Sequence, residues 1–330
     1  MEFRTTFPII KSEFSIDYET PVMFIGSCFS AEIGKKMEEG RMQVLINPAG
    51  TVYNPASIGS TLEAIIENRK FTITDLNKYG NLFISFSHYT NFSDEDKDIA
   101  LDKINSSTKN AHLFLKNAKM LFITFGTSRV YRLKETGRIV SNCHKLPDSN
   151  FTVELHDVEE IVRLWGSLLE KLNNFNKDLK VIFTVSPVRH WKDGAHGNQV
   201  SKSVLFLGIE HLLGNQTACG YFPAYELMMD DLRDYRFYAK DMIHPSAEAL
   251  DYIWEAFTET YFTPETKRIW REIKDITLAI NHRFVTDSRK GKKDFALVML
   301  RRITDAEKKF SYICLDKEKS YFINMLEDNQ

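Results

Sequence analysis

The sequence has few of the features that identify several large classes of protein. Its four cysteines are scattered and form no Cys-x-x-Cys pair, which is typical of reduced thiols rather than of a disulfide framework or a zinc site. It contains no His-Glu-x-x-His run or similar array of histidine and carboxylate ligands, and no glycine-rich phosphate-binding loop. We therefore expect no metal and no cofactor.

An excess of charge of one sign is also missing. The 43 lysine and arginine residues nearly balance the 45 aspartate and glutamate residues, so nothing predicts a nucleic-acid partner. No apolar run is long enough to cross a bilayer, and the N-terminal segment lacks the basic, apolar and cleavage regions of a secretion signal. These absences predict a cytoplasmic protein without a membrane span, and they predict no particular oligomeric state.

The sequence does contain short apolar runs that end in small or turn-forming residues. Such runs are typical of buried strands, and they occupy residues 22–27, 44–47, 120–126 and 181–187. Between them, apolar residues recur at the spacing of amphipathic helices over residues 31–39, 58–68, 94–116, 158–173 and 200–213. Alternating strands and helices predict an α/β fold, a three-layer α/β/α sandwich around a doubly wound, mostly parallel sheet.

The last part of the chain has a different pattern. After Phe262-Thr263-Pro264 the sequence contains helical runs and no further strand signal. We therefore predict a main domain over residues 1–262 and a helical extension over 263–330. A basic segment, Arg289-Lys290-Gly291-Lys292-Lys293, separates two of the helical runs, and we interpret it as a solvated loop rather than a contact for an acidic partner.

Ser27 follows the first apolar run, where a buried strand would end and a helix would begin. A serine at this position can act as an N-cap, with its hydroxyl accepting a backbone N–H of the helix. It can also be a nucleophile, because the oriented N–H groups at a helix N-terminus can hold an oxyanion. The second role requires a base, since a serine hydroxyl is weak until a neighbouring group takes its proton.

One histidine lies in a suitable context for that base. Residues 240–247 read Lys-Asp-Met-Ile-His-Pro-Ser-Ala, which places Asp241 and His244 three residues apart, just before a helix that Pro245 can begin. In such a loop the carboxylate can orient the imidazole while the other ring nitrogen faces a nucleophile. Asp-x-x-His alone is a weak signal, and Asp241 or Ser246 could instead serve as a helix cap.

The combination of Gly-Ser after the first strand with Asp-x-x-His-Pro before a late helix resembles the SGNH, or GDSL-like, hydrolase superfamily. More narrowly, the sequence resembles the GSCFA family, whose naming motif stands here as Gly26-Ser27-Cys28-Phe29-Ser30, with serine in place of the final alanine. The resemblance runs from about residue 2 to about residue 260, and it includes the stretches 47–55, 142–145, 221–226 and 231–244.

The resemblance implies a nucleophile at Ser27, a base at His244 and an orienting acid at Asp241. It also implies an oxyanion hole made by the Ser27 N–H, by a glycine N–H after the second strand and by an asparagine after the third. Gly50 is the natural candidate for the glycine. The third block departs from the superfamily pattern, because Gly126-Thr127-Ser128-Arg129 has no asparagine. The remaining candidate donors are Ser128 and Asn142.

Several polar residues near these motifs are candidates for substrate binding. Residues 233–238 combine two arginines with three aromatic rings, which suits a carbohydrate or an anionic substrate. The same residues suit an internal network that positions the Asp241–His244 loop. We predict substrate contacts for Asn54, Arg129, His144, Arg189, Arg233 and Arg236.

We therefore expect a serine-dependent esterase that removes a small acyl group, such as acetyl, from an oxygen ester of a carbohydrate or another small alcohol. The reaction would pass through an acyl-serine. Two alternatives remain open. A sugar hydroxyl could capture the same intermediate, which would make the protein an O-acyltransferase, or the fold could serve as a glycan-binding module without catalysis.

Overall fold

The computed structural model describes residues 7–214, 218–285 and 288–327. Its centre is a parallel five-stranded sheet in the order β10-β9-β5-β1-β2. The strands are β1 (Val22–Gly26), β2 (Val44–Ile46), β5 (Met120–Phe125), β9 (Lys180–Val185) and β10 (Cys219–Tyr221). Four of the five follow the predicted apolar runs, and the short β10 was not predicted.

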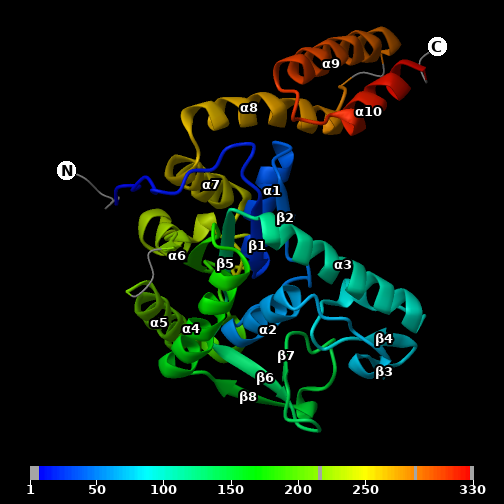
Figure 1. The fold of residues 1–330 in the computed structure, drawn as a ribbon. Helices are drawn as coiled ribbons and strands as arrows, with labels where there is room; N and C mark the ends of the chain where they lie inside the picture. Colours follow the sequence, from blue (N-terminus) through cyan, green and yellow to red (C-terminus); the bar gives the residue numbers. More distant parts are fainter. Residues whose placement is uncertain (1–6, 215–217, 286–287, 328–330) are drawn as a thin grey trace.

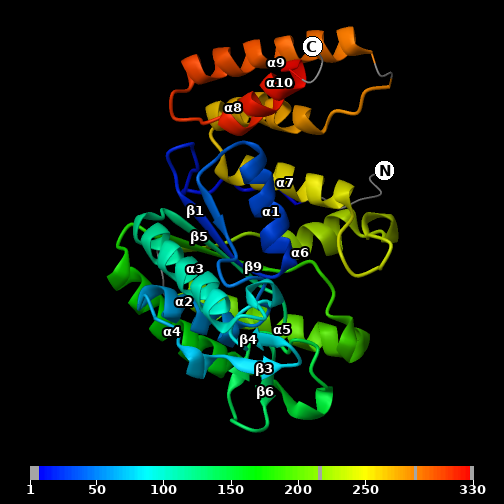
Figure 2. The ribbon, with the colours of Figure 1, turned by 90° about the vertical axis from the view of Figure 1, so that its right-hand side faces the viewer.

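Helices cover both faces of this sheet (Figures 1 and 2). One face is covered by α1 (Cys28–Glu39) and α7 (Ala247–Tyr261), and the other by α2 (Pro55–Ile66), α3 (Lys97–Asn117), α4 (Val158–Phe175) and α5 (Gly194–Leu213). In β1, Val22 and Phe24 pack into the first apolar cluster, whereas Met23 and Ile25 pack into the second. This alternation follows from the two-residue period of a strand buried on both sides. The predicted three-layer α/β/α fold is confirmed.

Two small antiparallel sheets were not predicted. One has the order β7-β6-β8, with β6 (Arg129–Leu133), β7 (Ile139–Val140) and β8 (Phe151–Leu155), and the other pairs β3 (Asn77–Tyr79) with β4 (Leu82–Ile84). These strands are short and largely exposed or half-buried, so they lack the continuous apolar run that identifies a buried strand. The β7-β6-β8 sheet begins at the end of β5 and therefore reaches the carboxyl edge of the central sheet.

Three further helices form the C-terminal part of the described chain, α8 (Pro264–Leu278), α9 (Arg289–Lys309) and α10 (Asp316–Glu327). They lie beyond α1 and α7 at one end of the molecule (Figure 1). The Trp270 indole donates to the carbonyl of Lys36 at 2.7 Å, and buried Glu318 pairs with Arg41 just after α1. Their apolar residues belong to the same buried cluster as α1 and α7. The helical nature of the extension is confirmed, and the division after residue 262 stays a prediction.

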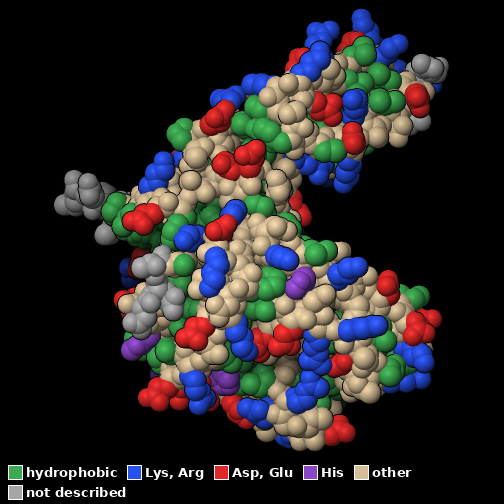
Figure 3. All heavy atoms as spheres, viewed as in Figure 1, with side chains coloured by type: hydrophobic (Ala, Val, Ile, Leu, Met, Phe, Trp, Pro, Cys, Tyr) green, Lys and Arg blue, Asp and Glu red, His purple; other side chains and the backbone are tan. Residues whose placement is uncertain are grey.

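The basic segment 289–293 was predicted as a loop, and this was wrong. It forms the first turns of α9, because Ser288 caps the helix by accepting the Gly291 N–H at 3.2 Å. Its basic side chains are exposed or half-buried, and Figure 3 shows lysine and arginine side chains along the outer edge of the C-terminal helices. Among the helices of the described chain, none has the length and apolar character needed to span a membrane.

Candidate active site

Ser27 lies at the junction of β1 and α1. It follows Gly26, whose φ of +146° is a conformation that residues with a Cβ rarely adopt. Ser27 occupies the N-cap position of α1, but its side chain makes no capping hydrogen bond. Its buried hydroxyl instead donates to the hydroxyl of Ser186, after β9, at 3.0 Å. Helix capping therefore does not explain why a serine stands here.

Asp241 and His244 form a pair within one short loop. Asp241 accepts the backbone N–H groups of His244 and Ile243 at 3.0 and 2.9 Å, and its Oδ2 lies 2.7 Å from His244 Nδ1. These hydrogen bonds, those of His244 foremost, lower the pKa of Asp241 to about 2. The carboxylate is therefore ionised at any ordinary pH. Because it holds Nδ1, the Nε2 atom is the ring nitrogen left for another partner.

Ser27 and His244 line one cavity of about 410 Å³, which we call the reaction cavity. Its walls come from the carboxyl ends of β1, β5 and β9, from the start of α2 and from the β7-β6-β8 sheet. Open parallel sheets bind ligands at this edge. Among the described residues Ser27 has no hydrogen bond to His244, and its hydroxyl donates to Ser186 instead. Catalytic hydrogen bonds are often absent or long before substrate binds.

Two of the predicted oxyanion donors are placed away from this cavity. The Gly50 N–H already donates to the Asn47 carbonyl at 2.7 Å, and Gly50 does not line the cavity. Ser128 is fully buried, with its N–H and its hydroxyl 2.8 and 3.2 Å from the Ser201 hydroxyl. The structure therefore places Gly50 and Ser128 outside the reaction cavity and gives no support for their predicted role as oxyanion donors. The Ser27 N–H makes a long hydrogen bond of 3.3 Å to the Thr124 carbonyl.

Two asparagines do line the reaction cavity. Asn54 caps α2, and its Oδ1 accepts the Ser57 N–H at 2.8 Å. Its Nδ2 group has no hydrogen-bond partner in the part of the chain that the structure describes, although the residue is only 5% exposed. The Asn142 Oδ1 accepts a hydrogen bond from the His144 N–H at 2.8 Å, and the Asn142 Nδ2 lies 3.5 Å from the Thr90 hydroxyl. Asn54 is therefore the better available amide donor.

Of the predicted substrate-binding arginines, Arg129 and Arg189 line the reaction cavity. Arg129 Nε lies 2.9 Å from Asp193 Oδ2, which holds the guanidinium against the cavity wall. The Arg189 guanidinium lies 4.2 Å from the centroid of the Tyr238 ring and 5.3 Å from that of Tyr235. The aromatic residues of segment 233–238 thus hold Arg189 beside the Asp241–His244 loop.

The other three predicted contacts lie outside the reaction cavity. The side chains of Arg233 and Arg236 are 77% and 75% exposed, and their charged atoms lie 3.7 and 3.8 Å from neighbouring aspartates. His144 is buried, and its Nε2 lies 2.8 Å from the Ser85 carbonyl oxygen. Burial lowers the pKa of His144, which favours a neutral structural ring. The structure therefore gives no support for substrate contacts at these positions.

Sequence reasoning missed the support that Lys202 gives to the site. This residue of α5 is buried, and its Nζ donates to the carbonyls of Gly126 at 2.8 Å and Ser186 at 2.7 Å. It thereby ties together the ends of β5 and β9. Burial lowers the pKa of Lys202 to about 7. A neutral amine has two N–H donors, which matches the two carbonyls. A lysine within a helical pattern gives no sequence signal of this role.

We expect the stability that Lys202 provides to depend on pH. Its folded-state pKa is lowered, so the unfolded chain binds more protons between pH values of about 7 and 10.5. The free energy of unfolding of the wild type should therefore rise relative to Lys202→Met over this range, by up to about 1.4 kcal/mol per pH unit. Urea unfolding at pH 7, 8 and 9 measures this difference. Exposed Lys116→Met is the control, and a difference for Lys202→Met that does not change with pH would contradict the expectation.

The cysteines are free thiols. Cys28 lines the reaction cavity, with its Sγ 3.8 Å from the Tyr53 hydroxyl. Burial raises the pKa of Cys143 to about 11, so this residue is poorly suited to act as a thiolate nucleophile. In the described part of the chain, no three histidine, cysteine, aspartate or glutamate residues are grouped in a way that could hold a metal ion.

A family model matches most of the chain. No curated protein matches the chain. The model of the GSCFA family matches residues 21–257, a segment that contains the Gly26-Ser27 turn, every wall of the reaction cavity and the Asp241–His244 loop. Because this segment is more than half of the sequence, the protein belongs to the GSCFA family.

Proposed function

We propose that the protein is a serine-dependent ester hydrolase of the SGNH type. It would remove a small acyl group, such as acetyl, from an oxygen ester of a carbohydrate or another small alcohol. The observation that carries the proposal is the placement of Ser27. Its hydroxyl stands at the N-terminus of α1 without capping the helix, and it shares a cavity with a histidine whose Nδ1 is held by a carboxylate.

In the proposed reaction, the Ser27 hydroxyl turns from Ser186 toward His244. Nε2 of His244 takes the hydroxyl proton as Oγ attacks the ester carbonyl carbon. The carbonyl oxygen becomes an oxyanion, which the Asn54 amide and the N–H groups at the start of α1 can stabilise. The C–O bond to the alcohol then breaks, the alcohol leaves with the proton from His244, and an acyl-serine remains.

Water completes the cycle by the same steps. His244 takes a proton from the water molecule as its oxygen attacks the acyl-serine, and it returns that proton to Ser27 as the acid leaves. Asp241 stays ionised and stabilises the imidazolium that forms in both halves of the reaction. A cavity of about 410 Å³ with tyrosine side chains at positions 53, 89 and 131 suits a small, partly apolar ester.

We expect 4-nitrophenyl acetate to acylate Ser27. Acid quenching during turnover, followed by mass spectrometry of the peptides, should show an acetyl group on the peptide that contains Ser27. An acetyl group on Cys28 in place of Ser27, or nitrophenol release without any adduct on Ser27 under rapid quenching, would contradict the proposal.

A further inference from the structure

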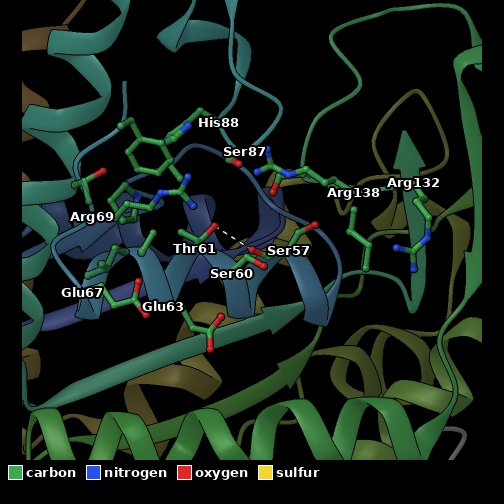
Figure 4. A pocket seen from close by; sticks show the side chains of 18 residues that line it. Ser57, Ser60, Thr61, Glu63, Glu67, Arg69, Ser87, His88, Arg132 and Arg138 are labelled. Carbon is green, nitrogen blue, oxygen red and sulfur yellow. Dashed lines mark hydrogen bonds between the residues drawn. The ribbon is translucent and has the colours of Figure 1, made fainter. Parts of the chain in front are cut away.

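A second cavity, of about 380 Å³, lies beside the reaction cavity. The two cavities share Ser141 in their walls, and the first turns of α2 separate them, with Asn54 on one side and Ser57 on the other. The proposed ester chemistry makes no use of the second cavity. Figure 4 shows that its polar side chains come from α2, from the segment after α2, from the loop before α3 and from β6.

Two guanidinium groups reach into the second cavity. In Figure 4, Arg69 and Arg138 point toward one another from opposite sides, above Thr61 and Ser57. Arg138 is exposed and has no ion pair in the described chain. Arg69 lies 2.5 Å from Asp75 through one nitrogen, and its guanidinium is 4.8 Å from the centroid of the Phe71 ring. A guanidinium has five N–H donors, so both arginines keep donors for an anion.

The other charged residues of the cavity are already paired or lie apart from Arg138. Arg132 pairs with Glu154 at 3.0 Å, and Glu63 pairs with Lys171 at 2.5 Å. Glu67 lies at the far end of the cavity from Arg138 (Figure 4). The centre of the second cavity is therefore the place where an anionic group meets the most favourable charge.

His88 contributes a polar atom from the buried side. It is only 4% exposed, its Nδ1 is 2.8 Å from the Ser85 hydroxyl, and its ring is enclosed by Phe71 and Phe92. Its Nε2 has no partner in the part of the chain that the structure describes. Burial lowers the pKa of His88 to about 4, so the ring is neutral and offers a directed hydrogen bond rather than a charge. His88 therefore adds a neutral hydrogen-bonding group to the wall of the second cavity.

Hydroxyl groups complete the lining. Ser60, Ser87 and Ser141 have hydroxyls without a hydrogen-bond partner in the described chain, while those of Ser57 and Thr61 donate to backbone carbonyls and keep lone pairs. Such a wall suits a ligand that carries several hydroxyl groups of its own. From these contacts we propose that the second cavity binds a sugar unit bearing an anionic group, either a carboxylate or a phosphate. Its guanidinium groups would take the anion, and its serines and His88 would take the sugar hydroxyls.

The test is a binding measurement on the full-length protein, with no ester present. The three probes are D-glucuronate, D-glucose 6-phosphate and D-glucose, titrated by isothermal calorimetry or ligand-observed NMR. We expect at least one anionic sugar to bind about tenfold or more tightly than glucose, since charge-assisted hydrogen bonds to arginine exceed neutral ones. Preference for glucuronate would identify a carboxylate site, and preference for glucose 6-phosphate a phosphate site.

Two variants locate the binding. Arg138→Gln should remove the preference for the anionic sugar, and it should leave the fold intact because Arg138 makes no ion pair within the described chain. Ser60→Phe, at an exposed position of α2, should fill the cavity and abolish binding of every probe. The matched control is Arg301→Gln on the exposed surface of α9, which should bind like the wild type.

Any one of three results would overturn the proposal. The first is that glucose binds as tightly as both anionic sugars, and the second is that none of the three probes binds at millimolar concentration. The third is that binding survives both Arg138→Gln and Ser60→Phe. Because these measurements need no turnover, their failure leaves the proposed esterase reaction at Ser27 untouched. Equally, loss of that reaction would not remove the binding.

Discussion

Ser27→Ala is expected to lower the rate of ester hydrolysis by about 10⁴-fold or more, because the variant has no oxygen at the position from which the acyl-serine forms. The same substitution should abolish labelling by a fluorophosphonate probe, which needs an activated serine. Ser186 is the matched control, because its hydroxyl lies 3.0 Å from that of Ser27 and lines the same cavity. Ser186→Ala should stay labelled and should keep its rate within about tenfold of the wild type.

His244→Ala should cause a loss of the same order as Ser27→Ala, since a serine hydroxyl without a base reacts slowly. Asp241→Asn should also lose most of the activity, because the amide cannot stabilise the imidazolium in the way the carboxylate does. Combining Ser27→Ala with His244→Ala should cost little more than either change alone. Labelling that persists in Ser27→Ala would refute the assignment of the nucleophile. Full labelling in His244→Ala would refute the assignment of the base.

Gly26→Ala is expected to prevent folding, with a loss of more than about 4 kcal/mol in the free energy of unfolding. A Cβ at this position would lie 2.3 Å from the backbone oxygen of Thr124 in the neighbouring strand. The glycine cannot move aside easily. Its N–H donates to the Asn47 side chain at 2.8 Å, and its carbonyl accepts the Val52 N–H at 3.0 Å.

Gly137→Ala separates the two causes of this loss. Gly137 also has a positive φ, +68°, but a Cβ there would meet no atom within 4 Å. Gly137→Ala should therefore cost only the strain of a left-handed backbone, about 1–2 kcal/mol, and the protein should still fold. Thermal unfolding and soluble yield compare the two variants. If Gly26→Ala were as stable as Gly137→Ala, the close contact with β5 would not be what requires a glycine.

The sequence predicts the central strands and the serine and histidine of the cavity because their signals are local. Each buried strand is a continuous apolar run, and Asp241 and His244 lie three residues apart in one loop. The contacts of Ser27 with Ser186 and of Lys202 with Gly126 join residues 159 and 76 positions apart. No pattern in the sequence indicates such pairs, because they depend on which strand ends meet at the sheet edge.

The site predictions that the structure does not support have the same origin. Arg233 and Arg236 stand in a dense charged and aromatic segment, yet neither of them lines the reaction cavity. Tyr235 and Tyr238 of the same segment instead lie against the guanidinium of Arg189, which does line it. Composition shows which groups a segment carries and not which side of the segment faces a cavity. Gly50 likewise follows the second strand as expected, but its N–H is used within its own turn. Asn54 was predicted as a substrate contact from its place in a polar loop. Only the structure shows that its Oδ1 caps α2 and that its Nδ2 is left without a partner among the described residues.

The contacts between α1 and the C-terminal helices bear on how the chain folds during its synthesis. The helix that begins beside Ser27 is synthesised before Trp270 and Glu318, which cover its far end. Until the C-terminal helices leave the ribosome, the apolar side chains of α1 and α7 that face α8 stay uncovered. The growing chain then exposes a surface that can bind chaperones or aggregate. Helix α1, which begins beside Ser27, is therefore synthesised well before the residues that complete its enclosure.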